Sequence, residues 1–392
     1  MARKRWVKIP DVLFFQEGPG VRNTQYTNDG VKLLNVANLV DGKVDLSTSE
    51  RYISESEAYG KYSHFLCDEG DFIVASSGIK VEYIDKKMGF IDKSMLPLCM
   101  NTSTIRFKVL NPNELRIRYF MYYLKSQHFK GQLFKQITGS AQLNYGPSHL
   151  KKMDLPLIDI GDQDIIIERL DKLQRIIDYR QEEINKLDEL IKARFVEMFE
   201  NGEHPIEKLG VICTKITDGT HKTPNYLAEG VTFISAKNIV NGELNFSDVK
   251  YISEEEYQEI QKRCQTEKLD ILLSKSGSLG SSAIVRTDEK LGLFESLAVL
   301  KYDRTKIVPE FLCEQLKSEK VQRQFSEGTK GVAIKHLHLG VISDTNIIIP
   351  SMEEQAAFAD FVKQVNKSKS VIQKSLEETQ LLFDSLMQEY FG

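Results

Sequence analysis

The sequence predicts an α+β fold. Two similar α/β domains are separated by two long helices, which pack on each other as an antiparallel coiled coil with pseudo-two-fold symmetry. Three observations predict this fold. A heptad pattern occupies the middle of the chain, a second heptad pattern closes it, and short strings of the first half recur in order 192 to 200 residues later. The chain is therefore predicted to be a tandem duplication of one globular domain followed by one long helix.

The central segment 163–199 has the pattern of a long amphipathic helix. Apolar residues alternate at steps of four and three, and the segment contains neither Pro nor Gly. The intervening residues are mostly charged, as on a solvated helix face. At ~1.5 Å per residue such a helix is ~55 Å long, more than one globular domain needs. Its seam is formed by Ile166, Leu170, Leu173, Ile177, Ile184, Leu187, Ile191 and Met198, with Arg180 and Arg194 at two further seam positions.

The last segment, 353–392, repeats this seam 192 residues later. Both seams are apolar at eight of ten positions, which favours packing of the two helices on each other over packing of each helix on its own domain. The seam itself fits either direction, and we expect the antiparallel one because it gives a closed two-fold arrangement. The second seam consists of Phe358, Val362, Val365, Ile372, Leu376, Phe383, Leu386 and Tyr390, with Lys369 and Thr379 at its polar positions.

The globular segments also repeat each other. The strand-like stretch 30–46 contains an Asp-Gly turn, and 230–246 has the same apolar pattern with Asn-Gly at the turn. Three further pairs of strings match in order: 51–54 with 250–253, 72–78 with 271–277, and 124–126 with 316–318. We therefore expect four parts: a first domain at 1–160, a helix at 161–200, a second domain at 201–352 and a helix at 353–392.

Composition places the chain among soluble cytoplasmic proteins. It has 392 residues, of which 41% are hydrophobic, enough for two cores. No apolar run approaches the ~20 residues of a membrane span, and the basic start is not followed by the apolar core of a secretory signal. The five cysteines are dispersed and are read as free thiols in a reducing compartment. We expect a cytoplasmic protein without a membrane partner.

The net charge of −4 is unevenly distributed. The segment 164–200 has ten acidic and seven basic residues, and 353–392 has seven and four, so the helices carry −6 and the rest of the chain +2. Because charge acts within a Debye length of ~8–10 Å, the mildly basic globular parts remain compatible with DNA.

No complete catalytic grouping is present. The sequence has no Gly-rich phosphate loop, no dinucleotide fingerprint, no His-Glu-x-x-His and no Asn/Asp-Pro-Pro-aromatic motif of an adenine methyltransferase. His336 and His338 could place two imidazoles on one strand face, but a third metal ligand is missing. We expect no catalytic residue, no metal and no cofactor.

Polar loops recur at matching places in both halves instead. Each loop alone is compatible with an ordinary surface turn, but hydroxyl, amide and cationic side chains in such loops suit phosphate and base-edge contacts. The candidate DNA contacts are Arg22, Asn23, Asn35, Asn38, Ser76, Ser77 and Lys80 in the first half, and Thr220, His221, Lys222, Thr223, Lys237, Asn238, Lys275, Ser276 and Ser278 in the second.

The Asp-Gly-Thr-His-Lys-Thr-Pro string at 218–224, the Thr-Gly-Ser-Ala-Gln string at 138–142 and the domain–helix–domain–helix plan resemble the specificity subunits of type I restriction-modification systems. The resemblance covers nearly the whole chain. The halves differ at two places: 17–20 stands where the second half has the 218–224 loop, and 331–335 stands where the first half has 138–142. This difference suggests that the two domains read different half-sites.

The resemblance implies a non-catalytic subunit with two target recognition domains, each bound to one half of a bipartite site in double-stranded DNA. It implies partners as well: two DNA methyltransferase (modification) subunits that use S-adenosylmethionine, and restriction (nuclease–translocase) subunits that use ATP. A dimer-like DNA-binding regulator and a non-enzymatic scaffold remain alternatives. A regulator is expected to have a stronger basic stripe than the +2 of the globular parts.

Overall fold

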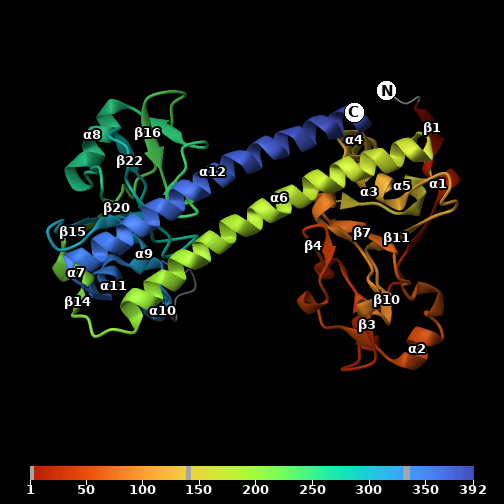
Figure 1. Ribbon diagram of the computed structural model, residues 1–392, viewed down its shortest axis with the longest axis horizontal. Helices are drawn as coiled ribbons and strands as arrows, with labels where there is room; N and C mark the ends of the chain where they lie inside the picture. The colour runs from red at the N-terminus through yellow and green to blue at the C-terminus, as the bar shows by residue number, and fades with distance from the viewer. Residues whose placement is uncertain (1–3, 138–142, 330–335) are drawn as a thin grey trace. The chain divides into compact units, whose positions relative to one another are not determined.

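The computed structural model describes residues 4–137, 143–329 and 336–392. The chain divides into two compact units, the first made of Met1–Tyr179 with Ser375–Gly392 and the second of Arg180–Lys374. Each unit contains one globular domain together with a part of each long helix (Figure 1). The compact units thus divide each long helix between them, and the four-part division expected from the sequence remains a prediction.

Both long helices form. α6 (Ile160–Phe195) continues into a π-helical turn at Val196–Glu200, and α12 covers Met352–Phe391. In the first unit the beginning of α6 shares a core with the end of α12, and in the second unit the end of α6 shares a core with the beginning of α12. The predicted antiparallel packing is therefore confirmed.

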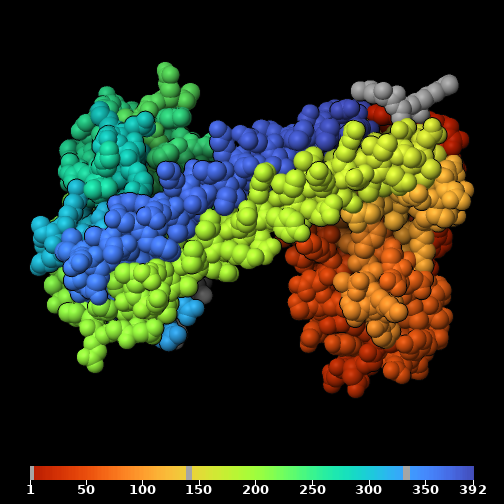
Figure 2. Space-filling model, in the orientation of Figure 1, coloured from red at the N-terminus to blue at the C-terminus, as the bar shows by residue number. Residues whose placement is uncertain are grey.

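All sixteen apolar seam residues lie buried or half-buried. Polar seam positions also have specific contacts. Lys369 donates to Asp188 of the other helix at 2.5 Å, Arg194 pairs with Glu197 and lies 6.0 Å from the Phe361 ring, and Thr379 donates to a carbonyl oxygen one turn back. In Figure 2 the side of each long helix that is turned to the viewer is not covered by other parts of the chain. A polar pair such as Lys369 with Asp188 forms in one register of the two helices and is broken when one helix shifts along the other.

The first domain is built on two small sheets. The antiparallel sheet has the order β2 (Leu13–Glu17), β11 (Thr104–Val109), β7 (Phe72–Ala75), β9 (Met88–Phe90). The mixed sheet has the order β10 (Leu98–Met100), β3 (Val31–Leu34), β6 (Tyr52–Ile53), with β10 parallel to β3. The remaining elements are β1 (Arg5–Lys8), α1 (Ile9–Val12), β4 (Leu39–Val40), β5 (Lys43–Val44), α2 (Glu55–Tyr59), β8 (Ser77–Ile79), α3 (Ile117–Lys125), α4 (Gln127–Gln136), β12 (Leu143–Asn144), α5 (Pro147–Leu150) and β13 (Asp154–Leu157).

The second domain repeats this plan. Its antiparallel sheet has the order β15 (Cys213–Asp218), β23 (Leu297–Tyr302), β20 (Ile271–Ser274), β21 (Ser282–Ile284). Its mixed sheet has the order β19 (Lys250–Ile252), β16 (Val231–Ile234), β22 (Leu291–Leu293). The remaining elements are β14 (Ile206–Lys208), α7 (Leu209–Ile212), β17 (Ile239–Val240), β18 (Glu243–Leu244), α8 (Glu254–Arg263), α9 (Pro309–Lys317), α10 (Glu319–Gly328), α11 (Leu339–Asp344) and β24 (Asn346–Ile348).

The turn signals seen in the sequence form the same hairpin in both domains. Asp41-Gly42 joins β4 to β5 and Asn241-Gly242 joins β17 to β18. All four residues have positive φ, between 46° and 79°, which is the requirement of a type I′ turn.

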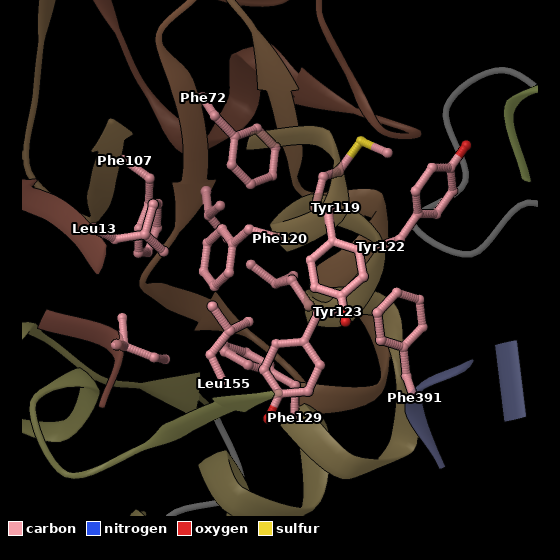
Figure 3. Packing of buried hydrophobic residues seen from close by; sticks show 14 of the residues in the cluster. Leu13, Phe72, Phe107, Tyr119, Phe120, Tyr122, Tyr123, Phe129, Leu155 and Phe391 are labelled. Atoms are coloured by element: carbon pink, nitrogen blue, oxygen red, sulfur yellow. The ribbon is translucent and has the colours of Figure 1, made fainter. Parts of the chain in front are cut away.

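Aromatic rings fill the core that each unit builds around the long helices. In the first unit Phe72, Phe107 and Phe120 pack between sheet and helices, and Phe391 of α12 lies against Tyr119 with ring centroids 5.1 Å apart (Figure 3). In the second unit four phenylalanine rings pack together, from α6, its π-helical turn, α9 and α12: Phe195, Phe199, Phe311 and Phe358. The helices thus complete the domain cores instead of lying on their surfaces.

A buried glutamine joins each domain to a long helix. Gln163 of α6 accepts a hydrogen bond from the Arg116 backbone N–H at 2.9 Å and donates to two carbonyl oxygens. Gln355 of α12 accepts from the Val308 N–H at 2.9 Å and also donates to two carbonyl oxygens. Both side chains are fully buried, so each fixes the helix against its own domain through satisfied polar contacts.

In the part of the chain that the structure describes, no helix has the length and the apolar composition needed to cross a bilayer.

Candidate nucleic-acid interface

The two domains place a carboxylate followed by glycine at the same point of the fold. Glu17 ends β2 and Asp218 ends β15, each paired with the long strand of its sheet. A Cβ at Gly18 would lie 2.0 Å from the Asn101 carbonyl oxygen, and a Cβ at Gly219 would lie 2.1 Å from that of Leu293. Only glycine permits this close approach of two backbones. The loops at 17–20 and 218–224 are therefore structural equivalents, as their positions in the sequence suggest.

In the second domain Asp218 is the centre of a charged cluster. Its side chain is 3% exposed and accepts hydrogen bonds from Lys275, which is 2% exposed, and from Arg263, which is 56% exposed. Lys275 follows β20, and Arg263 is the last residue of α8. Three segments distant in the sequence thus meet at one buried carboxylate. A buried ammonium requires such a partner, because an unpaired buried charge is strongly destabilising.

The protonation of Asp218 follows from these contacts. Burial acts to raise the pKa of the Asp218 carboxyl, but the hydrogen bond from Lys275 and the positive charges of Lys275 and Arg263 outweigh burial. The net effect holds the pKa of Asp218 below its ordinary value, so the group is a carboxylate at neutral pH.

His221 extends this cluster to the surface. One ring nitrogen lies 3.3 Å from Asp218 and the other 3.3 Å from Glu295, while Arg263 lies 3.3 Å from the first of them. Arg263, His221, Thr220 and Lys222 line a pocket of about 360 Å³ beside α8. The cluster therefore presents cationic and imidazole groups, with a buried anion behind them, at a concave surface that Glu255, Glu256 and Glu259 also line.

The first domain has different side chains at the equivalent place. The Ser76 hydroxyl donates to Glu17 at 3.4 Å, where the second domain has Lys275 and Asp218. The Tyr145 backbone N–H donates to the Ser76 carbonyl oxygen, as that of Leu337 does to Lys275. Burial and the charge of Glu17 raise the pKa of the Tyr145 hydroxyl, which stays neutral. Glu17 of the first domain thus lies among neutral hydroxyl groups, whereas Asp218 of the second domain lies among cations.

Five of the candidate DNA contacts lie inside the protein: Asn35, Asn38, Ser76, Asn238 and Lys275. Asn38 and Asn238 each accept a backbone N–H three residues back and donate to a carbonyl oxygen seven residues on. The Asn35 amide donates to the Leu33 carbonyl oxygen. In the structure these side chains form hydrogen bonds within turns and with other buried groups. We therefore propose that they stabilise the loops.

The other candidates are at least partly exposed: Arg22, Asn23, Ser77, Lys80, Thr220, His221, Lys222, Thr223, Lys237, Ser276 and Ser278. The structure brings some of them together. Thr220, His221 and Lys222 share the pocket beside α8, while Lys237 and Ser278 line a second groove of about 540 Å³ near the β17–β18 hairpin. Whether any of them touches DNA remains a prediction.

Sequence reasoning missed three residues that organise these loops. Arg263 and Glu295 join the Asp218 cluster from positions 45 and 77 residues away. Asn101 is 1% exposed, and its side-chain oxygen accepts from the Val21 N–H while its amide donates to Asn35. No local pattern marks these residues, since each acts through a contact between distant segments.

The metal alternative finds no support in the geometry. His336 and His338 lie in an irregular segment before α11 and not on a strand, with ring centroids 5.4 Å apart. Within 4–137, 143–329 and 336–392 no three His, Cys, Asp or Glu side chains are grouped as metal ligands. The strings 138–142 and 331–335 fall outside the described residues.

Comparisons with known proteins agree with the duplicated plan. Residues 8–189 and 206–380 each match the family model of the type I restriction modification DNA specificity domain. The chain is 28% identical over 162 residues to the type I restriction enzyme EcoBI specificity subunit of Escherichia coli. That match covers 41% of this chain and 34% of the relative. It is 21% identical over 392 residues to the EcoKI specificity subunit of Escherichia coli strain K12, covering 92% of this chain and 81% of the relative.

A third relative, the MjaVIII specificity subunit of Methanocaldococcus jannaschii, is 23% identical over 52% of this chain and 47% of its own length. The chain thus spans less than half of two of these three relatives. Among solved structures, the type I restriction-modification S subunit from M. genitalium superposes with a TM-score of 0.58 at 18% identity, covering 100% of this chain and 96% of that one. A chain from a structural study of complex assembly in the type I R-M system superposes at 0.53 and 14% identity, covering 99% and 97%. Both likenesses concern the fold.

Proposed function

Because the chain belongs to the family of type I restriction-modification DNA specificity proteins, we propose that it is the DNA-recognition subunit of such a system and carries out no chemistry itself. Each globular domain binds one half of a bipartite site in double-stranded DNA. Phosphate contacts set its position, and a few contacts to base edges set the sequence it accepts.

One observation carries this proposal: the two domains repeat one framework but change the side chains at its loops. The carboxylate–glycine turn, the hairpin turn and the buried asparagines recur, whereas the pair Lys275–Asp218 of the second domain is replaced by Ser76–Glu17 in the first. A repeated scaffold with altered loop chemistry suits two readers of different sequences.

The long helices suit the docking of protein partners. Tyr179 of α6 and Val371 of α12 stand at equivalent positions 192 residues apart and are 63% and 66% exposed. Leu190 and Leu382 form a second such pair, 46% and 51% exposed. Exposed apolar residues on an otherwise acidic surface favour a protein partner over DNA. Their duplication supports two copies of the same partner, which we propose to be the two methylation subunits, with restriction subunits joining that assembly.

Methylation mapping tests the recognition role. In a strain that carries this gene, methylated adenines are expected within one bipartite motif, and deletion of the gene should abolish methylation of that motif. Replacing 1–160 by the corresponding domain of another family member should change one half of the motif and leave the other half intact. Persistence of the motif without the gene contradicts the proposal.

Assembly with partner subunits tests the docking surface. The paired substitution Tyr179→Ala with Val371→Ala should weaken assembly with the methylation subunits, measured by analytical ultracentrifugation, while leaving the thermal unfolding of the chain alone nearly unchanged. Leu110→Ala, which removes an apolar side chain 56% exposed on the first domain, is the matched control. Equal weakening by the control would place the docking surface elsewhere. The purified chain alone should transfer no methyl group from S-adenosylmethionine.

A further inference from the structure

Resting on the proposed DNA recognition, we propose that Arg263 reads the edge of a guanine in the half-site of the second domain, and that Asp218 is the positioning residue that orients it. Neither residue is among the candidates that the sequence suggested. The inference concerns one base pair in one half-site.

Arg263 stands where the chain can present it to DNA. It is the last residue of α8, its side chain is 56% exposed, and it lines the same pocket as Thr220, His221 and Lys222. The rim of this pocket is the loop 218–224, which leaves the sheet at the carboxylate–glycine turn. The guanidinium therefore lies at the surface formed by the loop 218–224.

The Asp218 carboxylate holds that guanidinium from behind. One terminal nitrogen of Arg263 donates to one carboxylate oxygen of Asp218, and Lys275 donates to the other. Asp218 and Lys275 are almost completely buried, so the support is fixed by packing. Arginine has five N–H donors, and this contact uses one N–H of the nitrogen Nη2, which also lies 3.3 Å from His221 Nε2. With the His221 ring donating to Asp218 instead of accepting from Arg263, the second N–H of Nη2 forms a fork with a neighbouring donor for a ligand.

A fork of two parallel N–H donors matches guanine, whose major-groove edge offers the O6 and N7 acceptors side by side. Reading a base requires a fixed orientation, whereas contact with a phosphate requires only a charge nearby. A buried carboxylate behind an exposed arginine provides that orientation.

Glu255, Glu256 and Glu259 of α8 line the same pocket as Arg263. Their negative charges offset the attraction of the guanidinium for phosphate, so the proposed contact depends on the direction of its N–H donors and not on net charge. In the first domain the Ser76 hydroxyl faces Glu17 at the place of Lys275 and Asp218. We therefore assign this contact to the half-site of the second domain alone.

The substitution Arg263→Lys separates the two kinds of contact. Lysine keeps the positive charge but lacks the planar fork, so it retains a phosphate contact and loses a bidentate guanine contact. Arg263→Ala removes both. Lys262→Ala is the matched control, because Lys262 precedes Arg263 on the same helix, is exposed and pairs with Glu259 three residues back.

Each variant is expressed in place of the wild-type chain, and its methylated motif is mapped across the genome. Both Arg263 variants should lose the preference for guanine at one position of one half-site, with discrimination there reduced roughly five- to hundredfold. The other half-site and the Lys262→Ala motif should be unchanged. Circular dichroism of each purified chain verifies folding.

Two outcomes overturn the inference. If Arg263→Lys behaves as wild type while Arg263→Ala lowers methylation equally at all sites, Arg263 contacts phosphate. If both variants keep the full motif, Arg263 reads nothing. Failure of the recognition role itself is distinguishable, because the wild-type chain would then direct no bipartite motif.

Discussion

Phe358→Ala is expected to destabilise the second unit strongly. Phe358 of α12 is fully buried, and its ring packs against Phe199 at 5.4 Å, Phe195 at 5.6 Å and Phe311 at 6.5 Å between centroids. Removing a buried phenylalanine side chain costs about 3–5 kcal/mol, through lost burial and the cavity left behind. The three edge-on ring contacts place the expected value in the upper part of that range, since each such pair adds about 0.5–1.5 kcal/mol.

The chain provides its own reporter for the assay. Its single tryptophan, Trp6, belongs to the first unit, so tryptophan fluorescence reports that unit while far-UV circular dichroism reports both. In a urea titration Phe358→Ala should move the dichroism transition to lower urea and shift the fluorescence transition less, because stability is not uniform across a structure.

Val371→Ala is the matched control, on the same helix and in the same unit but 66% exposed, with an expected effect below about 0.5 kcal/mol. An unchanged dichroism midpoint for Phe358→Ala, or an equal shift for Val371→Ala, would refute the conclusion that the long helices complete the domain cores.

Three further predictions follow from the helices, the ion cluster and the thiols. Inserting one heptad within 170–190 and a matching heptad within 365–385 lengthens the helix pair by ~10 Å. The preferred spacer between the two half-sites should then grow by about three base pairs. An unchanged spacer in the methylated motif would show that the helices do not set the spacer length. The pKa of Asp218 lies below its ordinary value of 3.8, so its ion pairs stabilise the fold above that pH and are lost as the pH falls below it. Asp218→Asn should therefore flatten the decline in thermal stability during acid titration, and a decline as steep as that of wild type would contradict this. Burial raises the pKa of Cys67, Cys213 and Cys264 to about 12. Iodoacetamide at pH 8 should therefore label these thiols slowly in the native chain and rapidly in urea, as measured by mass spectrometry. Rapid labelling of the native chain would contradict their burial.

The sequence alone determined the duplication and the two long helices. Periodicity is a local property, so the heptad steps of 163–199 and 353–392 identify both helices and their apolar faces without knowledge of any partner. The Asp-Gly and Asn-Gly turns likewise have one strongly preferred hairpin geometry, and the structure has it at both places.

The direction of helix packing was decided only by the tertiary structure. A heptad seam is apolar in either direction, and two-fold symmetry only favours the antiparallel packing. The choice is made by long-range contacts that place opposite ends of the two helices together, such as those of Arg169 with Tyr390 and of Phe195 with Phe358. Contacts between residues distant in the sequence leave no periodic signal in either segment.

The same limit applies to the candidate interface. Sequence reasoning selected polar residues in loops, and the string at 218–224 does contain His221 and Lys222 at the pocket. It could not distinguish the exposed Lys237 from the buried Asn238 beside it, because exposure depends on what packs above the turn. Nor could it find Arg263, which acquires its place only when the fold brings the end of α8 to the buried carboxylate of Asp218, 45 residues away.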